Sequence, residues 1–385
     1  MDSTFNLTAE SEFLAPNVVN KYAHPKDKTY NSRQRYKDQD ADSFTDFIHW
    51  NLVFIVIPLV SILGIIGNAL SLIVISKQGL RKSSNILLFS LAVSDIVFMI
   101  GVNGPPKPMY EWGGGGFQYP RETAMALFYL YHFFDSLNWG SGPTSLCIPV
   151  LITIERLIAV FFPLKFTSIV TRRRTIIAVI ATNVIFYGLQ AYVRTWFQFI
   201  YIYDSKRNAS IGFSTRNSMY VFQNEVSSVI EMFFNSMIIL VIFVGSGCIA
   251  IGAKIKIAAI KRLKMTSSHG NQISKGDTGI SRTTKTLLCL CVFYTFVCAP
   301  ISLPAFMPGI MVFPVFAEDP NFRSVGVFVY HVYKTVFCFN ASCNFIIYVA
   351  MSKSFRDTLF QLINTKRKNV SSCSAIISVT RGTDI

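Results

Sequence analysis

Seven long apolar stretches recur along this chain of 385 residues, and each is long enough to cross a lipid bilayer as a helix. A spanning helix needs roughly 20 consecutive, mostly apolar residues. The prolines inside these stretches do not argue against helices, because packed membrane helices tolerate proline as a kink. We therefore predict an all-α membrane protein, built as a bundle of seven transmembrane helices. The predicted spans are 52–75, 86–102, 124–162, 175–193, 226–253, 286–312 and 325–351.

The distribution of charge predicts how this bundle is oriented. Charged residues make up 15% of the chain, whereas soluble domains carry about 25%. If residues 1–50 lie outside the cell, the inner segments contain 21 basic and 3 acidic residues, and the outer segments contain 13 and 14. Basic residues accumulate on the cytoplasmic side, so we expect this orientation, in the plasma membrane. The net charge of +15 then faces anionic lipid and a signalling partner, which removes the need for a nucleic-acid ligand.

The segments outside the spans follow from this topology. Residues 1–50 are expected to be a disordered extracellular segment that lacks the apolar core of a cleavable signal peptide, so that the first span acts as the insertion signal. Two glycosylation sequons, at Asn6 and Asn208, fall on the outer side. The other predicted parts are a seven-helix domain at 51–351, an amphipathic helix at 352–364 and a cytoplasmic tail at 365–385.

A pair of opposite charges, Glu155-Arg156, stands at the inner end of the third span, followed by Ala-Val and Pro-Leu within 159–164. Taken alone, such a pair could simply snorkel to the interface. The full string, however, closely resembles the Asp/Glu-Arg-Tyr motif of rhodopsin-like (class A) G-protein-coupled receptors. In that family the neighbouring acid holds the arginine at rest, and activation releases it toward the G protein. The resemblance therefore implies that Arg156 is the main coupling residue.

Three further motifs of that family occur in the expected spans and order. Gly67-Asn68 resembles its Gly-Asn pair, residues 91–95 its Leu-Ala-x-x-Asp, and residues 344–348 its Asn-Pro-x-x-Tyr, which ends here at Tyr348. An amphipathic helix follows, with one apolar face made of Phe355, Leu359, Phe360 and Ile363. Four motifs in register identify the chain as a member of this family, most similar to invertebrate FMRFamide-type peptide receptors and molluscan chemosensory receptors.

The resemblance also implies partners and an ion site. Such receptors activate a heterotrimeric G protein, and an arrestin and a receptor kinase are further expected partners beside membrane lipid. Asp95 is a carboxylate in mid-membrane, where a charged group needs polar side chains as neighbours. Ser145, Asn340 and Asn344 occupy positions of the family's sodium pocket, whose oxygen ligands suit a hard cation. The alternative is a hydrogen-bond network around a protonated Asp95, and no other cofactor is expected.

Several family features are missing from this sequence. The third-span position that normally carries a disulfide cysteine is Tyr131, and residues 194–225 contain no cysteine, so the second outer loop should be more mobile. Cys298 replaces the usual switch tryptophan, and Phe345 replaces a proline. The acid at the base of the sixth span is also absent, which leaves the Thr284 hydroxyl as a partner for the arginine.

The outer halves of the spans predict a ligand site. The ionisable residues Asp135, Glu231 and Lys334 lie there, and His331 lies one turn from the lysine. Asn138 occupies the position where amine receptors carry an acid, so an amine ligand is not expected. Charges in a half-dry pocket suit a peptide or a polar chemosensory molecule. The competing interpretation is that the lysine and the glutamate snorkel to the outer interface.

A transporter or channel is the main alternative class. It would show internal repeats or broken helices with polar groups along one pathway, and no repeat is evident. An enzyme would need a nucleophile or a metal site, and no His-x-x-x-His or Cys-pair ligand spacing occurs. We therefore predict a receptor rather than a transporter or an enzyme.

Overall fold

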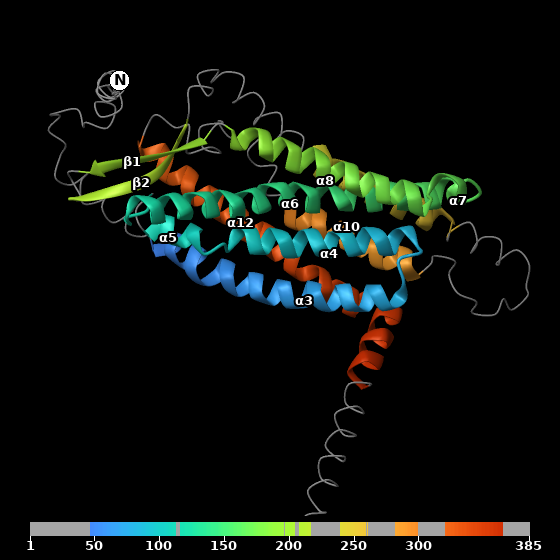
Figure 1. Ribbon diagram of the computed structural model, residues 1–385. Helices are drawn as coiled ribbons and strands as arrows, with labels where there is room; N and C mark the ends of the chain where they lie inside the picture. The colour runs from blue at the N-terminus through green and yellow to red at the C-terminus, as the bar shows by residue number, and fades with distance from the viewer. Residues whose placement is uncertain are drawn as a thin grey trace, which may run out of the picture. The chain divides into compact units, whose positions relative to one another are not determined.

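The computed structural model describes residues 47–112, 116–195, 197–204, 208–216, 239–258, 260, 282–298 and 320–364. The chain divides into two compact units, and the second of these, His49–Ile385, is a bundle of long helices (Figure 1). A π-helical turn, η1 (Leu52–Val56), precedes the first of them. The long helices are α3 (Ile57–Gln78), α4 (Ser83–Val102), α6 (Arg121–Phe161), α8 (Arg172–Arg194), Ile239–Ala258, α10 (Arg282–Cys298) and α12 (Pro320–Met351).

These helices have the length and surface of membrane spans. Six are long and apolar enough to cross a membrane, and α10 contributes a shorter apolar helix at Thr286–Cys298. Large aliphatic side chains on their outer faces, such as Ile62, Ile180 and Ile242, are more than half exposed. Lipid solvates such faces, whereas water would not. The prediction of a helical membrane bundle is confirmed, and every predicted span coincides with an apolar helix over the described residues.

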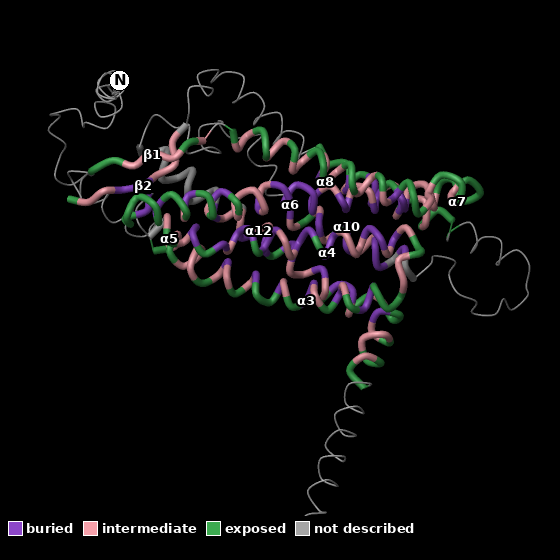
Figure 2. The backbone as a smooth tube through the Cα atoms, in the orientation of Figure 1, coloured by how far each residue is buried: buried purple, intermediate pink, exposed green. Residues whose placement is uncertain are grey.

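The helix α6 lies at the centre of the packing. It contacts α4, α8 and α10, while α3 packs between α4 and α12, and α10 also contacts α12. Figure 2 shows the buried backbone concentrated on α6 and α4, in the middle of the bundle. Pro143 and Pro149 lie inside α6 without ending it, as packed membrane helices allow. Residues of α6 can therefore touch several neighbouring helices at once.

One element departs from the purely helical prediction. The strands β1 (Phe197–Asp204) and β2 (Ala209–Arg216) follow α8 and form an antiparallel hairpin. Phe117 extends this sheet by a bridge to Gly212, with backbone hydrogen bonds of 2.7 and 3.0 Å. The prediction for this segment was an outer loop without regular structure, so the hairpin is a correction. We call this end of the bundle the hairpin end, and the opposite one, where α6 finishes, the Arg156 end.

Aromatic and polar contacts attach the hairpin to the bundle. The rings of Tyr131 and Tyr110 lie 5.0 Å apart, and Phe117 packs in the same cluster with Phe199 of β1. His132 of α6 is joined to Ser214 of β2 by a hydrogen bond of 3.2 Å. The seven described cysteines are all free, so no disulfide is present in this part of the chain. The greater mobility expected for this loop stays a prediction.

A short helix at 353–364 follows α12. Phe355 is 4% exposed and packs against Phe345 and Tyr348, and Leu359 is partly buried beside it. The other two residues of the predicted apolar face, Phe360 and Ile363, are exposed. Three predicted parts lie outside the described residues. They are the extracellular segment up to residue 46, the sequon at Asn6 within it, and the tail at 365–385.

Candidate functional site

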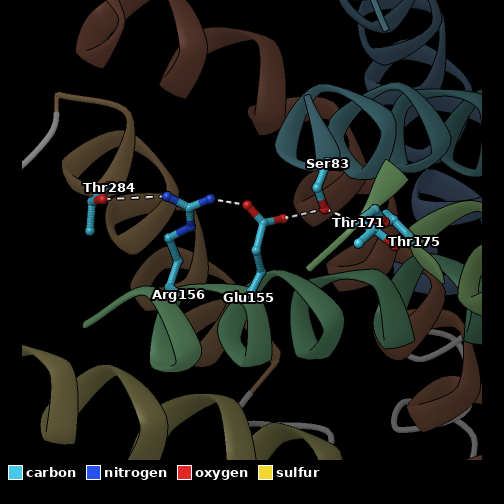
Figure 3. Close-up of polar contacts among 6 residues, drawn as sticks. All are labelled: Ser83, Glu155, Arg156, Thr171, Thr175 and Thr284. Carbon is cyan, nitrogen blue, oxygen red and sulfur yellow. Dashed lines mark hydrogen bonds and ion pairs between the residues drawn. The ribbon is translucent and has the colours of Figure 1, made fainter. Parts of the chain in front are cut away.

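Glu155 and Arg156 lie near the end of α6, and both are buried. Figure 3 shows the guanidinium between two partners. Its Nη2 donates to Oε1 of Glu155, and its Nη1 donates to Oγ1 of Thr284 at 3.4 Å. A buried charge is tolerated only when it is paired and hydrogen-bonded. The arginine thereby connects α6 to α10, and the hydroxyl partner expected at Thr284 is present.

The second carboxylate oxygen of Glu155 extends this network to two more helices (Figure 3). It accepts a hydrogen bond of 3.0 Å from Ser83 at the start of α4. The Ser83 hydroxyl in turn lies 2.7 Å from the hydroxyl of Thr175 on α8. One polar chain therefore joins α10, α6, α4 and α8 at the Arg156 end. Neither hydroxyl was predicted, because the only signal in the sequence is their place near the ends of neighbouring spans.

Two further contacts connect α6 with α10 toward the middle of the bundle. The hydroxyl of Tyr294 donates to the carbonyl oxygen of Leu146 at 3.2 Å. One to two turns nearer the Arg156 end, the Thr153 hydroxyl lies 3.5 Å from the sulfur of Cys291. Helical spacings of three, four and seven place contacts on one face. These two contacts and the Arg156–Thr284 bond therefore form three polar links along one face of α10. Tyr294 was not among the predicted site residues.

Tyr348, the third predicted coupling residue, lies in the core between these helices. It is 2% exposed and packs against Phe355, with ring centroids 5.6 Å apart. Its hydroxyl has no hydrogen-bond partner among the described residues. Buried hydroxyls are nearly always satisfied by protein or ordered water, so this oxygen points to water inside the bundle.

Asp95 of α4 is fully buried at the point where three helices meet. Its carboxylate accepts hydrogen bonds from Ser145 of α6 and from Asn344 of α12, the latter at 2.7 Å. Asn340 is buried one turn earlier on α12, but within the described structure no hydrogen bond joins it to this carboxylate. Asn68 donates instead to the backbone of Ala341 at 2.9 Å. The structure thus assembles three of the four predicted ion-site residues.

At the hairpin end, Asp135 of α6 forms an ion pair of 2.9 Å with Lys107. This lysine belongs to the short helix α5 (Pro106–Trp112), and its side chain is 8% exposed, compared with 23% for the aspartate. His132, which holds the hairpin, lies one turn away on α6. Asn138 is buried on the next turn of the same helix. Lys107 was not among the predicted site residues, because it falls between two predicted spans.

The other predicted ligand residues lie on α12 or outside the described residues. His331 is 3% exposed and packs edge-on against His49, with ring centroids 4.4 Å apart. Lys334 is half-buried one turn further along. Glu231 falls outside the described residues. Asn208, the second sequon, is exposed beside the hairpin turn, with a positive φ of 49° that asparagine accepts readily.

Comparison with known proteins places this architecture in a family. A family model described as serpentine type 7TM GPCR chemoreceptor Srw matches residues 55–366. The galanin-like G-protein coupled receptor npr-9 of Caenorhabditis elegans is 25% identical over 333 residues, which cover 81% of this chain and 72% of that receptor. The FMRFamide receptor of Drosophila melanogaster is 32% identical over 127 residues, or 31% of this chain and 22% of that protein.

A third relative, the GQ-coupled rhodopsin of the scallop Mizuhopecten yessoensis, is 23% identical over 332 residues, 82% of this chain and 60% of that protein. The family model covers the bundle from the first span to the helix at 353–364, and its members are receptors rather than transporters. The prediction of a G-protein-coupled receptor is therefore confirmed, and the chain belongs to the Srw family of seven-transmembrane chemoreceptors.

Proposed function

We propose that this receptor works in the plasma membrane with its hairpin end outside, where it binds a peptide or a small polar molecule. The Arg156 end then faces the cytoplasm and activates the G protein. The excess of basic residues in the segments at that end supports this orientation. Relatives named for galanin-like signalling, FMRFamide and neuromedin-U support a peptide.

The observation that carries the coupling proposal is the enclosure of Arg156, which is 8% exposed and bonded to both Glu155 and Thr284. While these bonds hold, the guanidinium cannot reach a partner. Movement of α10 away from α6 breaks the Thr284 bond and frees donors for the backbone carbonyls of an inserted helix. The described arrangement is therefore the resting state of the receptor.

Leu164 supplies a second contact for a cytoplasmic partner. It lies just before the short helix α7 (Phe166–Ile169), and it is 96% exposed. Burying a leucine contributes about 1.5–3 kcal/mol. Positive charges follow it in the sequence, at Lys165 and Arg172–Arg174. This combination suits a partner that has an apolar pocket beside acidic residues. A G protein, an arrestin or a receptor kinase can use the same surface in turn.

The ligand site proposed at the hairpin end is centred on Asp135 and Lys107. The aspartate is the more accessible member of this pair. A ligand that carries both charges can replace either partner, which fits a peptide better than a purely apolar molecule. Lys334 and His331 contribute from α12, and the hairpin attached to His132 covers the same end of α6. Glycosylation at Asn208 is compatible with its exposed place beside the turn.

Sodium is a fitting occupant for the Asp95 site. The carboxylate, the Ser145 hydroxyl and the Asn344 amide provide the hard oxygen ligands that such a cation takes. Two buried polar atoms, Oδ1 of Asn68 and the hydroxyl of Tyr348, have no described partner and call for water or an ion in the interior. The ion would stabilise the negative charge of Asp95 and hold α4, α6 and α12 together.

The coupling proposal is tested with Arg156→Ala in the full-length receptor. We expect ligand-stimulated and basal signals in calcium and cyclic-AMP assays to be abolished. Surface expression should largely survive, because Glu155 keeps its hydrogen bond from Ser83. Loss of the cationic partner still costs stability at this buried carboxylate, so signals are compared at equal surface expression. Arg156→Lys is the matched control, since it keeps the charge but cannot make the paired contacts, and it should be strongly impaired. Normal signalling by Arg156→Ala would overturn the assignment.

A further inference from the structure

Two cysteine thiols meet between the fifth and sixth spanning helices. Cys248 lies on the helix Ile239–Ala258, and Cys291 lies on α10. They are 7% and 2% exposed and belong to the same buried cluster. The packing of their helices brings the two side chains together. Both are free cysteines, so the pair is a dithiol in this structure.

The packing of the two helices explains why these thiols meet. A Cβ atom added at Gly245 would lie 3.0 Å from Cγ2 of Thr295, so the backbone of the fifth helix approaches α10 closely. Consecutive spans run in opposite directions, so a step forward along one helix corresponds to a step back along its neighbour. Three residues after Gly245 comes Cys248, and four residues before Thr295 comes Cys291. The two cysteines therefore lie opposite each other.

A second glycine keeps the fifth helix close to α6 as well. A Cβ at Gly247 would lie 2.5 Å from Cγ2 of Thr153, whose hydroxyl contacts the Cys291 sulfur. Three helices therefore converge at this thiol pair. A disulfide needs Cβ atoms about 3.5–4.5 Å apart, which requires a close approach of the two helices such as the one at Gly245. On α10, Cys291 lies two turns from Thr284, the residue that bonds to Arg156.

We infer that Cys248 and Cys291 form a redox-sensitive pair, which hydrogen peroxide oxidises to a disulfide linking the fifth helix to α10. In this reaction the two S–H bonds and the peroxide O–O bond break, and one S–S bond forms. The thiols give up two electrons and two protons, and the peroxide becomes two molecules of water. Cytosolic reductants keep such thiols reduced under ordinary conditions and would reverse the oxidation.

The consequence for signalling rests on the proposed function. Release of Arg156 requires α10 to move away from α6, and the disulfide would tie α10 to a helix that itself packs on α6 through Gly247. Oxidation would therefore hold the receptor at rest. Cys289, two residues before Cys291 on α10, is only partly buried and provides a matched control thiol.

The disulfide is tested by fragment linkage in the full-length receptor, with a protease site inserted after Gly270 between the two helices. Membranes are treated with hydrogen peroxide, alkylated, cleaved and run on a denaturing gel without reductant. We expect the two fragments to stay linked in wild type and in Cys289→Ser, and to separate in Cys248→Ser, in Cys291→Ser, and after reduction of wild type. Separate fragments in oxidised wild type would overturn the inference.

Nucleotide exchange on a G protein, measured in the same membranes without ligand, tests the effect on signalling. Oxidation should lower basal exchange several-fold in wild type and in Cys289→Ser, and leave Cys248→Ser unchanged. Linked fragments with unchanged exchange would establish the disulfide but overturn its restraint on α10. The gel does not depend on signalling, so a failure of the proposed coupling mechanism is distinguished from a failure of the thiol pair.

Discussion

The hydroxyl of Thr284 accepts a hydrogen bond of 3.4 Å from Arg156, on the helix where related receptors often place an acid. The donor is charged, but at 3.4 Å the bond is long, so it should be worth about 0.5–1.5 kcal/mol net, like an ordinary protein hydrogen bond. An ion pair in a partly buried site can exceed this. The resting state should therefore lie only slightly below the active one. A gap of about 1.4 kcal/mol leaves the active state near one-tenth populated, which is measurable basal activity.

Thr284→Asp should lower this basal activity, because it supplies the missing acid, and Thr284→Ala should raise it by about two- to ten-fold, which corresponds to the loss of one hydrogen bond. The measurement is basal second messenger across a dose series of expressed receptor. Thr182→Ala is the matched control, since that hydroxyl bonds to its own helix at Ala178. Equal basal signals in the two Thr284 variants would mean that some other contact holds the resting state.

Tyr294→Phe should also raise basal activity, because it removes the hydroxyl that donates to Leu146 and keeps the buried ring. The expected effect is again about two- to ten-fold on basal nucleotide exchange. Combining Tyr294→Phe with Thr284→Ala should give the sum of the two free-energy changes if the contacts act independently. An unchanged basal rate in Tyr294→Phe would mean that Tyr294 stabilises the resting state through its buried ring and not through its hydrogen bond.

The Asp95 site predicts a specific response to sodium. The thermal unfolding temperature of the receptor should be higher in sodium chloride than in N-methylglucamine chloride at equal ionic strength, because an ion that binds only the folded state stabilises it. Asp95→Asn should remove the difference between the two salts. Equal unfolding temperatures for wild type would favour the hydrogen-bond network without an ion.

The ion pair between Lys107 and Asp135 predicts an asymmetry between single and double substitutions. Asp135→Leu leaves a buried ammonium group without its partner and should lower the unfolding temperature markedly, since breaking a buried pair costs up to about 3–5 kcal/mol. The partial exposure of the aspartate reduces that cost. Adding Lys107→Met should restore most of the loss. A double variant as unstable as Asp135→Leu would show that the loss does not come from the unpaired charge of Lys107.

The contacts predicted best are those that the resemblance to the receptor family implies. Its motif register placed Arg156, Thr284 and Asp95, and the structure brings each to a predicted partner. Contacts that no family motif marks were missed. The hydroxyl of Ser83 meets Glu155 through the packing of α4 on α6, which no local pattern encodes. Lys107 was missed for the same reason.

The hairpin illustrates a second limit. This segment was predicted as an outer loop, although the aromatic residues of β1 alternate along the chain, a pattern typical of a strand. Asn340 and Asn344 were both predicted beside Asp95. Asn344 donates to the carboxylate, whereas Asn340, one turn away on the same face of α12, has no described hydrogen bond to it. Which residue of such a pair makes the contact depends on the packing of α12 against α4.

The attachment of the hairpin through Tyr131, Phe117 and His132 has a consequence for biogenesis. None of the eight cysteines lies in the segments predicted to be outside. With this end outside, as proposed, its attachment needs no disulfide between these segments. We therefore expect the receptor to remain folded in a reducing medium that would dismantle relatives with a covalent bridge.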